Sequence, residues 1–441
     1  MRISDDLAKV LKTPMTVDEL GIPKSMLVDL IFRVLFREGD VSLTRFGEVL
    51  HLHTQLLDSV LAHLQREHLL EITKAGGLGR LSFTYALTDA GMKRARDALE
   101  KSHYIGPAPV DLKSYTDGIH LQTNDRIPVT PDQVKNALQP LVLPENFHRR
   151  IGPAVSSGSS LFLYGPPGNG KTTVAQLLGE MLGNAESIYL PYALAVGGQI
   201  IQINDPLVHI PWVDKTPSTN GGQPSSSINP GVTNNKLDRR WGLFQRPAVM
   251  VGGELTMDAL DLRFEPVAKF YEAPLQLKAN GGMFLIDDFG RQQIGPDKLL
   301  NRWIVPLESE IDFLRLQSGQ TVEVPFRQLI VFCTNLDPSD LVDGAFLRRI
   351  HMKVEVGGPD EKKFFQIFVD ACRSYKMPFD REGFMYLLKA WYRETDRVMQ
   401  SVHPRDIVKT IVAICEYEGI RPQLTPELID EACQSYFVDL G

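Results

Sequence analysis

The sequence predicts an α/β protein: a central domain with a mostly parallel sheet, an N-terminal α+β domain before it and a C-terminal helical domain after it. From residue 146 to 357, short apolar runs alternate with stretches of helical periodicity. This alternation is typical of a parallel sheet flanked by helices. From residue 358 onward only helical periodicity remains, in four stretches. A chain of 441 residues is long enough for two or three such domains.

The first 104 residues read as three helices, a hairpin and a closing helix. The amphipathic stretch "PKSMLVDLIFRVLFREG" has a proline near its start and Gly39 after its end, which are helix boundary signals. The hairpin "ITKAGGLGRLSFTYAL" turns around Gly76, Gly77 and Gly79. This order resembles a winged-helix domain, with the three glycines at the tip of the wing.

Composition changes mark two further segments. Residues 105–145 are rich in proline, which predicts a linker with one helix starting near Thr130. Residues 214–235 are rich in Ser, Asn, Gly and Pro, and we expect a mobile surface loop there. The predicted domains are therefore 1–104, a linker at 105–145, the α/β domain at 146–357 and a helical domain at 358–441.

Charge and cysteine usage indicate a cytoplasmic protein without a membrane partner. The net charge is −7, so the chain as a whole does not attract nucleic acid or acidic lipid. Its four cysteines are far apart and form no metal-binding pair, which predicts reduced, mostly buried thiols. The first residues lack a basic start followed by an apolar core, so we expect no signal peptide. No apolar run reaches the roughly 18 residues that a membrane span needs.

The stretch "LFLYGPPGNGKTTVAQLLGEML" carries the strongest chemical signal. Gly165, Gly170, Lys171 and Thr172 match GxxxxGK[ST], between a short apolar run and a helical stretch. In this setting a glycine-rich turn lets backbone N–H groups surround phosphates at a helix N-terminus. We expect Lys171 to pair with the β- and γ-phosphates and the Thr172 hydroxyl to bind magnesium. The expected nucleotide contacts are Gly165, Pro166, Pro167, Gly168, Asn169, Gly170, Lys171, Thr172 and Thr173.

Two adjacent acids end the apolar run "MFLIDDFGR" at residues 283–291. A carboxylate at the end of a buried run is costly unless it serves a cation or a reaction. We expect Asp287 to hold magnesium through water, and Asp288 to orient and polarise the water that attacks the phosphate. A later apolar run, "QLIVFCTNLDP", ends in Thr334 and Asn335, and we expect Asn335 to hold the same water.

Together these motifs resemble those of AAA+ ATPases: Walker A at 165–172, Walker B at 284–288, sensor 1 at Asn335 and a helical lid. The resemblance implies an α/β P-loop AAA+ module, ATP and Mg²⁺ as cofactors, and a homo-oligomeric ring, a hexamer. It covers residues 146–441.

Arginines stand at three positions where AAA+ proteins use them. "DGAFLRRIHMKVEV" places Arg348 and Arg349 at the end of a predicted helix, where the family carries an arginine finger that reaches a neighbouring subunit's nucleotide. "SVHPRDIV" places Arg405 at the position of the sensor 2 arginine, which reaches the nucleotide of its own subunit. Arg239 and Arg240 in "LDRRWG" are further candidates for a contact between subunits.

A narrower resemblance comes from the segments around the acids. "APLQLKANGGMFLIDDFGR" is similar to the corresponding region of magnesium chelatases, MCM helicases and enhancer-binding proteins. A predicted hairpin turning at Ser318 and Gly319 resembles the pre-sensor-1 hairpin group, which includes the MoxR-type ATPases. The winged helix followed by "GGELT" and "DDFGRQ" resembles bacterial predicted ATPases with chaperone activity.

Three functions remain open from the sequence. The first is ATP-driven remodelling of an unidentified protein client. The second is a DNA-directed motor recruited by the winged helix; residues 1–101 carry fourteen basic and fourteen acidic residues, so no excess of positive charge supports it. The third is a nucleotide-gated switch with little hydrolysis, because Asp288 stands where most AAA+ proteins have glutamate and its carboxylate lies about 1–1.5 Å further back.

Overall fold

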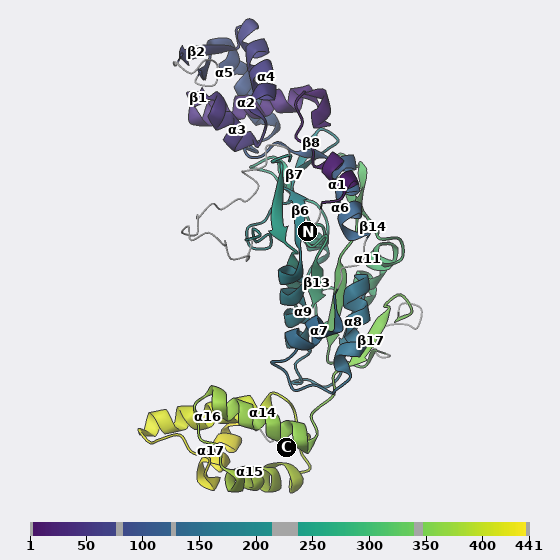
Figure 1. The fold of residues 1–441 in the computed structure, drawn as a ribbon, viewed down its shortest axis with the longest axis vertical. Helices are drawn as coiled ribbons and strands as arrows, with labels where there is room; N and C mark the ends of the chain where they lie inside the picture. Colours follow the sequence, from purple (N-terminus) through teal and green to yellow (C-terminus); the bar gives the residue numbers. More distant parts are fainter. Residues whose placement is uncertain (1–2, 76–82, 125–128, 214–236, 339–346, 438–441) are drawn as a thin grey trace. The chain divides into compact units, whose positions relative to one another are not determined.

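The structure is a computed structural model that describes residues 3–75, 83–124, 129–213, 237–338 and 347–437 (Figure 1). The chain forms two compact units: unit 1 comprises 1–127, 182–284 and 298–329, and unit 2 comprises 128–181, 285–297 and 330–441. The predicted wing tip at 76–79 and the predicted loop at 214–235 lie outside the described residues. The division into domains at 1–104, 146–357 and 358–441 stays a prediction.

An N-terminal α+β arrangement belongs to unit 1. Its antiparallel sheet has the order β1-β3-β2 and pairs Val41 with Tyr85 and Leu70 with Leu87. Helix α3 begins at a capping residue, because Ser42 accepts a hydrogen bond from the backbone N–H of Arg45. The elements are α1 (Asp5–Val10), α2 (Lys24–Glu38), β1 (Val41–Ser42), α3 (Leu43–Leu50), α4 (Thr54–Arg66), β2 (Leu70–Lys74), β3 (Thr84–Leu87) and α5 (Asp89–Lys101).

The core of this N-terminal part includes residues from later in unit 1. Ala193 and Ile200 are buried in one apolar cluster with the N-terminal helices.

Arg240 is buried in unit 1, with 4% of its surface exposed, and pairs with Asp238 at 2.8 Å. Its guanidinium also donates hydrogen bonds to the carbonyl of Leu20 at 3.0 Å and to the carbonyl of Pro109 at 2.9 Å. The prediction that Arg240 contacts a neighbouring subunit is therefore wrong, because its guanidinium is already enclosed and paired within unit 1. Arg239 beside it is exposed.

A second sheet of unit 1 has the order β11-β12-β8-β7-β4. Its strand β4 and the helix α6 that follows lie in the segment predicted to be irregular; Asp111 caps α6 by accepting from the N–H of Ser114. The expected hairpin is present as β14 and β15, which pair from Ile311 with Pro325 to Arg315 with Thr321. The remaining elements are β4 (Val110–Asp111), α6 (Leu112–Thr123), β6 (Ser187–Pro191), β7 (Ala193–Val196), β8 (Gln199–Gln202), β9 (Trp241–Gln245), β11 (Arg263–Glu265), β12 (Phe270–Glu272), α10 (Leu275–Lys278), α11 (Pro296–Ser309), β14 (Ile311–Arg315) and β15 (Thr321–Pro325).

The central sheet has the order β10-β13-β16-β5-β17, and β16 and β17 both run parallel to β5. Every residue of β13 and β16 is buried, as expected for strands that helices cover on both faces. The α/β fold class predicted from the alternating pattern is confirmed. The elements here are β10 (Ala248–Val251), β13 (Met283–Ile286), β16 (Leu329–Thr334), β5 (Leu161–Tyr164), β17 (Met352–Glu355), α7 (Pro131–Ala137), α8 (Phe147–Ser157) and α9 (Lys171–Ala185).

The C-terminal part of unit 2 is helical, as predicted, and its helices gather at the end of the chain in Figure 1. It has its own apolar core, centred on Phe364, Phe368 and Ile411. A π-helical turn, η5 (Leu388–Arg393), continues α15. The helices are α14 (Glu361–Ser374), α15 (Arg381–Leu387), α16 (His403–Glu418) and α17 (Pro426–Tyr436). Across the described residues, no helix combines the length and the apolar character that crossing a membrane requires.

Candidate functional site

The glycine-rich loop follows β5 and leads directly into α9, and its backbone depends on glycine. Gly165, Gly168 and Gly170 have φ angles of 129°, 75° and 85°, a region in which side chains are disfavoured. A Cβ atom on Gly165 would also lie 2.7 Å from the carbonyl oxygen of Val356, at the end of β17. The loop therefore needs glycine where it passes close to the end of β17, and it leads into the N-terminus of α9, whose first N–H groups have no helical acceptors.

Lys171 is the first residue of α9 and only 7% of it is exposed. Its Nζ donates hydrogen bonds of 2.8 Å to the carbonyls of Gly165 and Pro166, at the start of the loop. Burial lowers the pKa of Lys171, while the nearby Cys333, Asp287 and Asp288 act in the opposite direction. The loop therefore already holds the amine of Lys171 close to its own backbone.

Of the other predicted contacts in the loop, Asn169 is buried, whereas Pro166, Pro167 and Thr173 are at least partly exposed.

Thr172 and Asp287 meet at the end of β13. The Thr172 hydroxyl donates to the carboxylate of Asp287, at 2.9 Å from one oxygen and 3.0 Å from the other. One of these oxygens also accepts the backbone N–H of Asp288, at 3.0 Å. A hydroxyl beside a carboxylate is a set of hard oxygen donors, which is the ligand type that Mg²⁺ prefers.

Asp288 and Asn335 are also brought together, although 47 residues separate them. The amide of Asn335 donates to the carboxylate of Asp288 at 3.2 Å. Two further bonds tie the strand ends to each other: Phe289 N–H donates to the carbonyl of Cys333, and the Thr334 hydroxyl donates to the carbonyl of Phe289, both at 2.7 Å. Since Thr334 pairs with Tyr164 at the end of β5, Asn335 follows that strand pair at the same sheet edge as the glycine-rich loop.

The N-terminal end of α16 contacts the glycine-rich loop. The backbone N–H of Val402 donates to the carbonyl of Gly168 at 2.9 Å, and that of Ser401 to the side-chain oxygen of Asn169 at 3.1 Å. Arg405 lies in the first turn of α16; its side chain is 65% exposed and its Nε donates to Asp406 at 3.1 Å. Arg405 therefore lies on the helix that contacts the loop, with its guanidinium bonded to Asp406.

Arg348 and Arg349 come shortly before β17. Arg348 is exposed and Arg349 is partly exposed. Ser160 holds the backbone here: its hydroxyl donates to the carbonyl of Arg349 at 3.3 Å and accepts the N–H of His351 at 3.1 Å. Residues 339–346, which contain most of the helix predicted before these arginines, lie outside the described residues.

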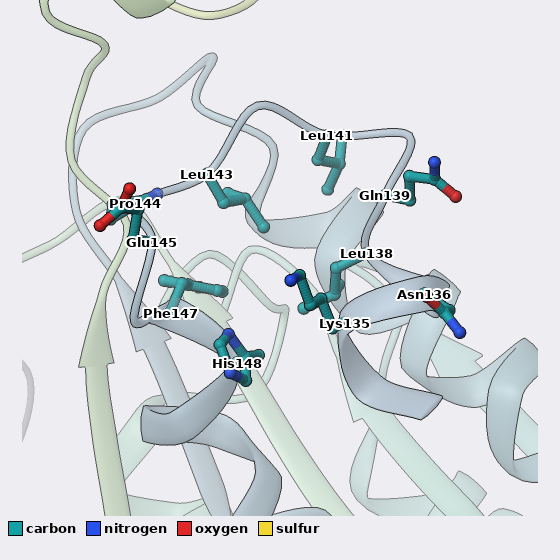
Figure 2. A pocket seen from close by; sticks show the side chains of 10 residues that line it. All are labelled: Lys135, Asn136, Leu138, Gln139, Leu141, Leu143, Pro144, Glu145, Phe147 and His148. Atoms are coloured by element: carbon teal, nitrogen blue, oxygen red, sulfur yellow. The ribbon is translucent and has the colours of Figure 1, made fainter. Parts of the chain in front are cut away.

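Two features of unit 2 were not predicted from the sequence. One is Gln292, whose amide bonds to the backbone of the turn that carries Asp287 and Asp288. The other is a hollow of about 280 Å³ at the ends of α7 and α8, which Figure 2 shows from close by. Apolar and polar side chains both line it, and the residues are Lys135, Asn136, Leu138, Gln139, Leu141, Leu143, Pro144, Glu145, Phe147 and His148.

Comparison with known proteins adds a family match in the C-terminal part. A model described as "Domain of unknown function (DUF8689)" matches residues 360–435, a stretch that holds α14, α15, α16 and most of α17. No curated protein matches the sequence.

Several solved structures are similar in shape at low identity. A crystal structure of NtrX from Brucella abortus has a TM-score of 0.40 and 11% identity over 72% of this chain; the chain spans 57% of the length of that NtrX chain. NtrX in complex with ATP has a TM-score of 0.38 and 12% identity, covering 80% of this chain and 66% of the other. A mutant of RuvB from Thermotoga maritima has a TM-score of 0.36 and 11% identity, covering 70% and 72%. The α/β fold follows from the strand order and connections of the central sheet.

Proposed function

We propose that this protein is an ATPase of the AAA+ type that binds MgATP and hydrolyses it. The observation that carries the proposal is the convergence of three separate segments on one sheet edge. Thr172 after the loop bonds to Asp287 at the end of β13, and Asp288 next to it bonds to Asn335 after β16. A buried cation, a hydroxyl, two carboxylates and an amide gathered there serve phosphate chemistry better than they serve packing.

The loop would bind the phosphates. Its N–H groups and the N-terminus of α9 supply fixed positive partial charge, and Lys171 supplies a full charge. The Lys171 amine already bonds to two carbonyls of the loop, so on binding it would exchange these for oxygens of the β- and γ-phosphates. The hollow at α7 and α8, with apolar side chains such as Leu138 and Phe147 in its lining, is our candidate for the surface that receives the base.

Asp287 and Thr172 would hold magnesium, which when bound neutralises phosphate charge and aligns the phosphate oxygens.

Asp288 would act as the general base. The water oxygen bonds to the γ-phosphorus while the bond from that phosphorus to the bridging oxygen breaks, and the electron pair leaves with ADP. The water proton passes to Asp288, and the products are ADP and inorganic phosphate. The amide of Asn335 donates to the Asp288 carboxylate and would orient the same water.

The proposed assembly is a homo-oligomeric ring, a hexamer, in the cytoplasm. Arg349, with Arg348 beside it, would serve the site of a neighbouring subunit, while Arg405 would leave Asp406 to reach the nucleotide of its own chain. The proposed substrate of the motor is a protein client. The alternative is DNA, for which α4 is the candidate recognition helix; the basic residues near its end, His63 and Arg66, lie beside Glu67, which forms a 3.3 Å contact with His63.

Phosphate release from ATP tests the proposal directly. The wild-type chain should release phosphate in the presence of Mg²⁺. Lys171→Ala should weaken nucleotide binding, whereas Asp288→Asn should keep it and lose about 10²–10⁴-fold in turnover, the usual contribution of a general base.

A wild-type chain that binds ATP without releasing phosphate would favour the nucleotide-gated switch. Equal turnover in Asp288→Asn and wild type would contradict the assigned base. Salt-sensitive stimulation by duplex or single-stranded DNA would favour the DNA-directed motor.

A further inference from the structure

The turn that carries the two acids has an uncommon backbone. Asp288 has a φ angle of 49°, in the left-handed region, and Gly290 has a φ angle of 100°. Glycine adopts such angles freely, whereas among other residues aspartate and asparagine are the ones that tolerate the left-handed region best. The direction of the Asp288 side chain therefore depends on keeping this backbone in a conformation of low intrinsic preference.

A single side chain spans the turn. The amide nitrogen of Gln292 donates to the carbonyls of Asp287, at 2.8 Å, and of Asp288, at 3.0 Å. Its amide oxygen accepts the backbone N–H of Gly290 at 2.8 Å. A glutamine amide has two hydrogens on nitrogen and lone pairs on oxygen, so all three bonds can form together. The two peptide groups that flank Asp288 are thus both held by Gln292.

Other bonds hold the turn as well, and one of them shares the Asp288 carbonyl with Gln292. The carboxylate of Asp288 accepts from Asn335, and Phe289 is tied to Cys333 in the neighbouring strand. Within the turn, the N–H of Arg291 donates to the carbonyl of Asp288 at 2.9 Å. Gln292 therefore supplies side-chain bonds that a single substitution outside the two acids would remove.

We propose that Gln292 is a positioning residue of the hydrolytic site: its amide clamps the turn from Asp287 to Gly290 in the left-handed conformation that directs the short Asp288 carboxylate toward Asn335. The inference rests on the proposed ATPase function. It deepens that function by identifying what compensates for the missing methylene of Asp288. Without the clamp the carboxylate would sample other directions, and a displacement of about 1 Å at a reacting group can cost about 10²-fold in rate.

The test compares neighbouring glutamines. Gln292 is partly buried and Gln293 is exposed, so Gln293→Ala is a matched control. We expect Gln292→Ala to lower kcat about 10–100-fold with KM for ATP within about twofold of wild type, because Gln292 bonds to the backbone of the turn that carries the two acids and not to the phosphate loop. Gln292→Met keeps the length of the side chain without its polar groups and should behave like Gln292→Ala. It also serves as the second variant if Gln292→Ala does not fold.

A readout independent of turnover separates the clamp from the ATPase assignment. Hydrogen exchange of the peptide that covers residues 287–292 should be faster in Gln292→Ala and Gln292→Met than in Gln293→Ala, since the Gly290 N–H loses its acceptor. Turnover and exchange equal to those of Gln293→Ala would overturn the clamp while leaving an active wild type intact. A wild type without phosphate release would instead defeat the proposed function, and the exchange comparison would still decide whether Gln292 holds the turn.

Discussion

Asp288 is one methylene shorter than a glutamate, and the structure gives a physical reason for the short acid. Its φ angle of 49° lies in the region that aspartate occupies more readily than glutamate. Its carboxylate already reaches the amide of Asn335 at 3.2 Å. The backbone conformation and the bond to Asn335 thus both suit an aspartate at this position.

Asp288→Glu should accordingly slow the proposed phosphate release. The longer side chain would push its carboxylate past Asn335, and the left-handed backbone would cost more with glutamate, so we expect phosphate release to fall about tenfold or more. Steady-state turnover of the two proteins at saturating ATP measures this, with nucleotide affinity as the control for an intact loop. A rate above that of the wild type would show that chain length was limiting and that the backbone does not compensate.

The sequence was informative where chemistry is local. The loop at 165–172 and the positions of Asp287, Asp288 and Asn335 follow from motifs whose spacing has a physical meaning. Gln292 could not be found this way, because its role depends on a positive φ angle at Asp288 that no residue pattern reveals. The prediction for Arg240 failed for a related reason. Its guanidinium bonds to the carbonyl of Leu20, which is far away in the sequence, and pairs with Asp238, whose burial no motif indicates.

Among the elements, the contact between α16 and the glycine-rich loop has the clearest consequence. Asn169 is buried and uses its side-chain oxygen to accept the N–H of Ser401, while its side-chain nitrogen donates to the carbonyl of Pro166 at 3.3 Å. Asn169 therefore links the two ends of the contact by side-chain bonds. A residue of the loop thus helps to hold the helical part of unit 2.

Asn169→Ala should destabilise this contact, whereas Ser401→Ala should not, because Ser401 contributes its backbone and not its hydroxyl. Loss of one such hydrogen bond costs about 1 kcal/mol. We expect the thermal unfolding midpoint of Asn169→Ala to lie below that of wild type, with Ser401→Ala close to wild type. Equal midpoints for Asn169→Ala and Ser401→Ala would show that the contact does not contribute to stability.

Element types were predicted better than element pairings. The alternation of strands and helices, the C-terminal helices and the hairpin at Ser318 and Gly319 were all legible from periodicity and turn residues. The helix α6 was missed because prolines on both sides of it made the whole of residues 105–145 read as a linker. The strand pair of β4 with β7 was missed because it joins Val110 to Leu194, a partnership that only the folded chain defines.

At the scale of the assembled protein, the proposed trans action of Arg349 can be separated from an action within one chain. Lys171→Ala chains keep Arg349 but lose the lysine proposed to bind phosphate. Arg349→Ala chains keep that lysine but lose the arginine. Each variant alone should have little turnover. Mixing the two should restore part of the phosphate release, because a Lys171→Ala subunit can supply Arg349 to an intact loop in its neighbour. Mixtures no more active than the separate variants would place Arg349 outside the neighbouring site, and size-exclusion chromatography of each variant controls for assembly.

The shared core of unit 1 bears on whether the N-terminal part is a self-contained module. Residues near the start of the chain pack with Ala193 and Ile200, and the carbonyls of Leu20 and Pro109 accept hydrogen bonds from the buried guanidinium of Arg240. A self-contained module needs a core and hydrogen bonds that are complete without the rest of the chain. The N-terminal part lacks such independence at these contacts, because β7, β8 and the Asp238–Arg240 pair complete them.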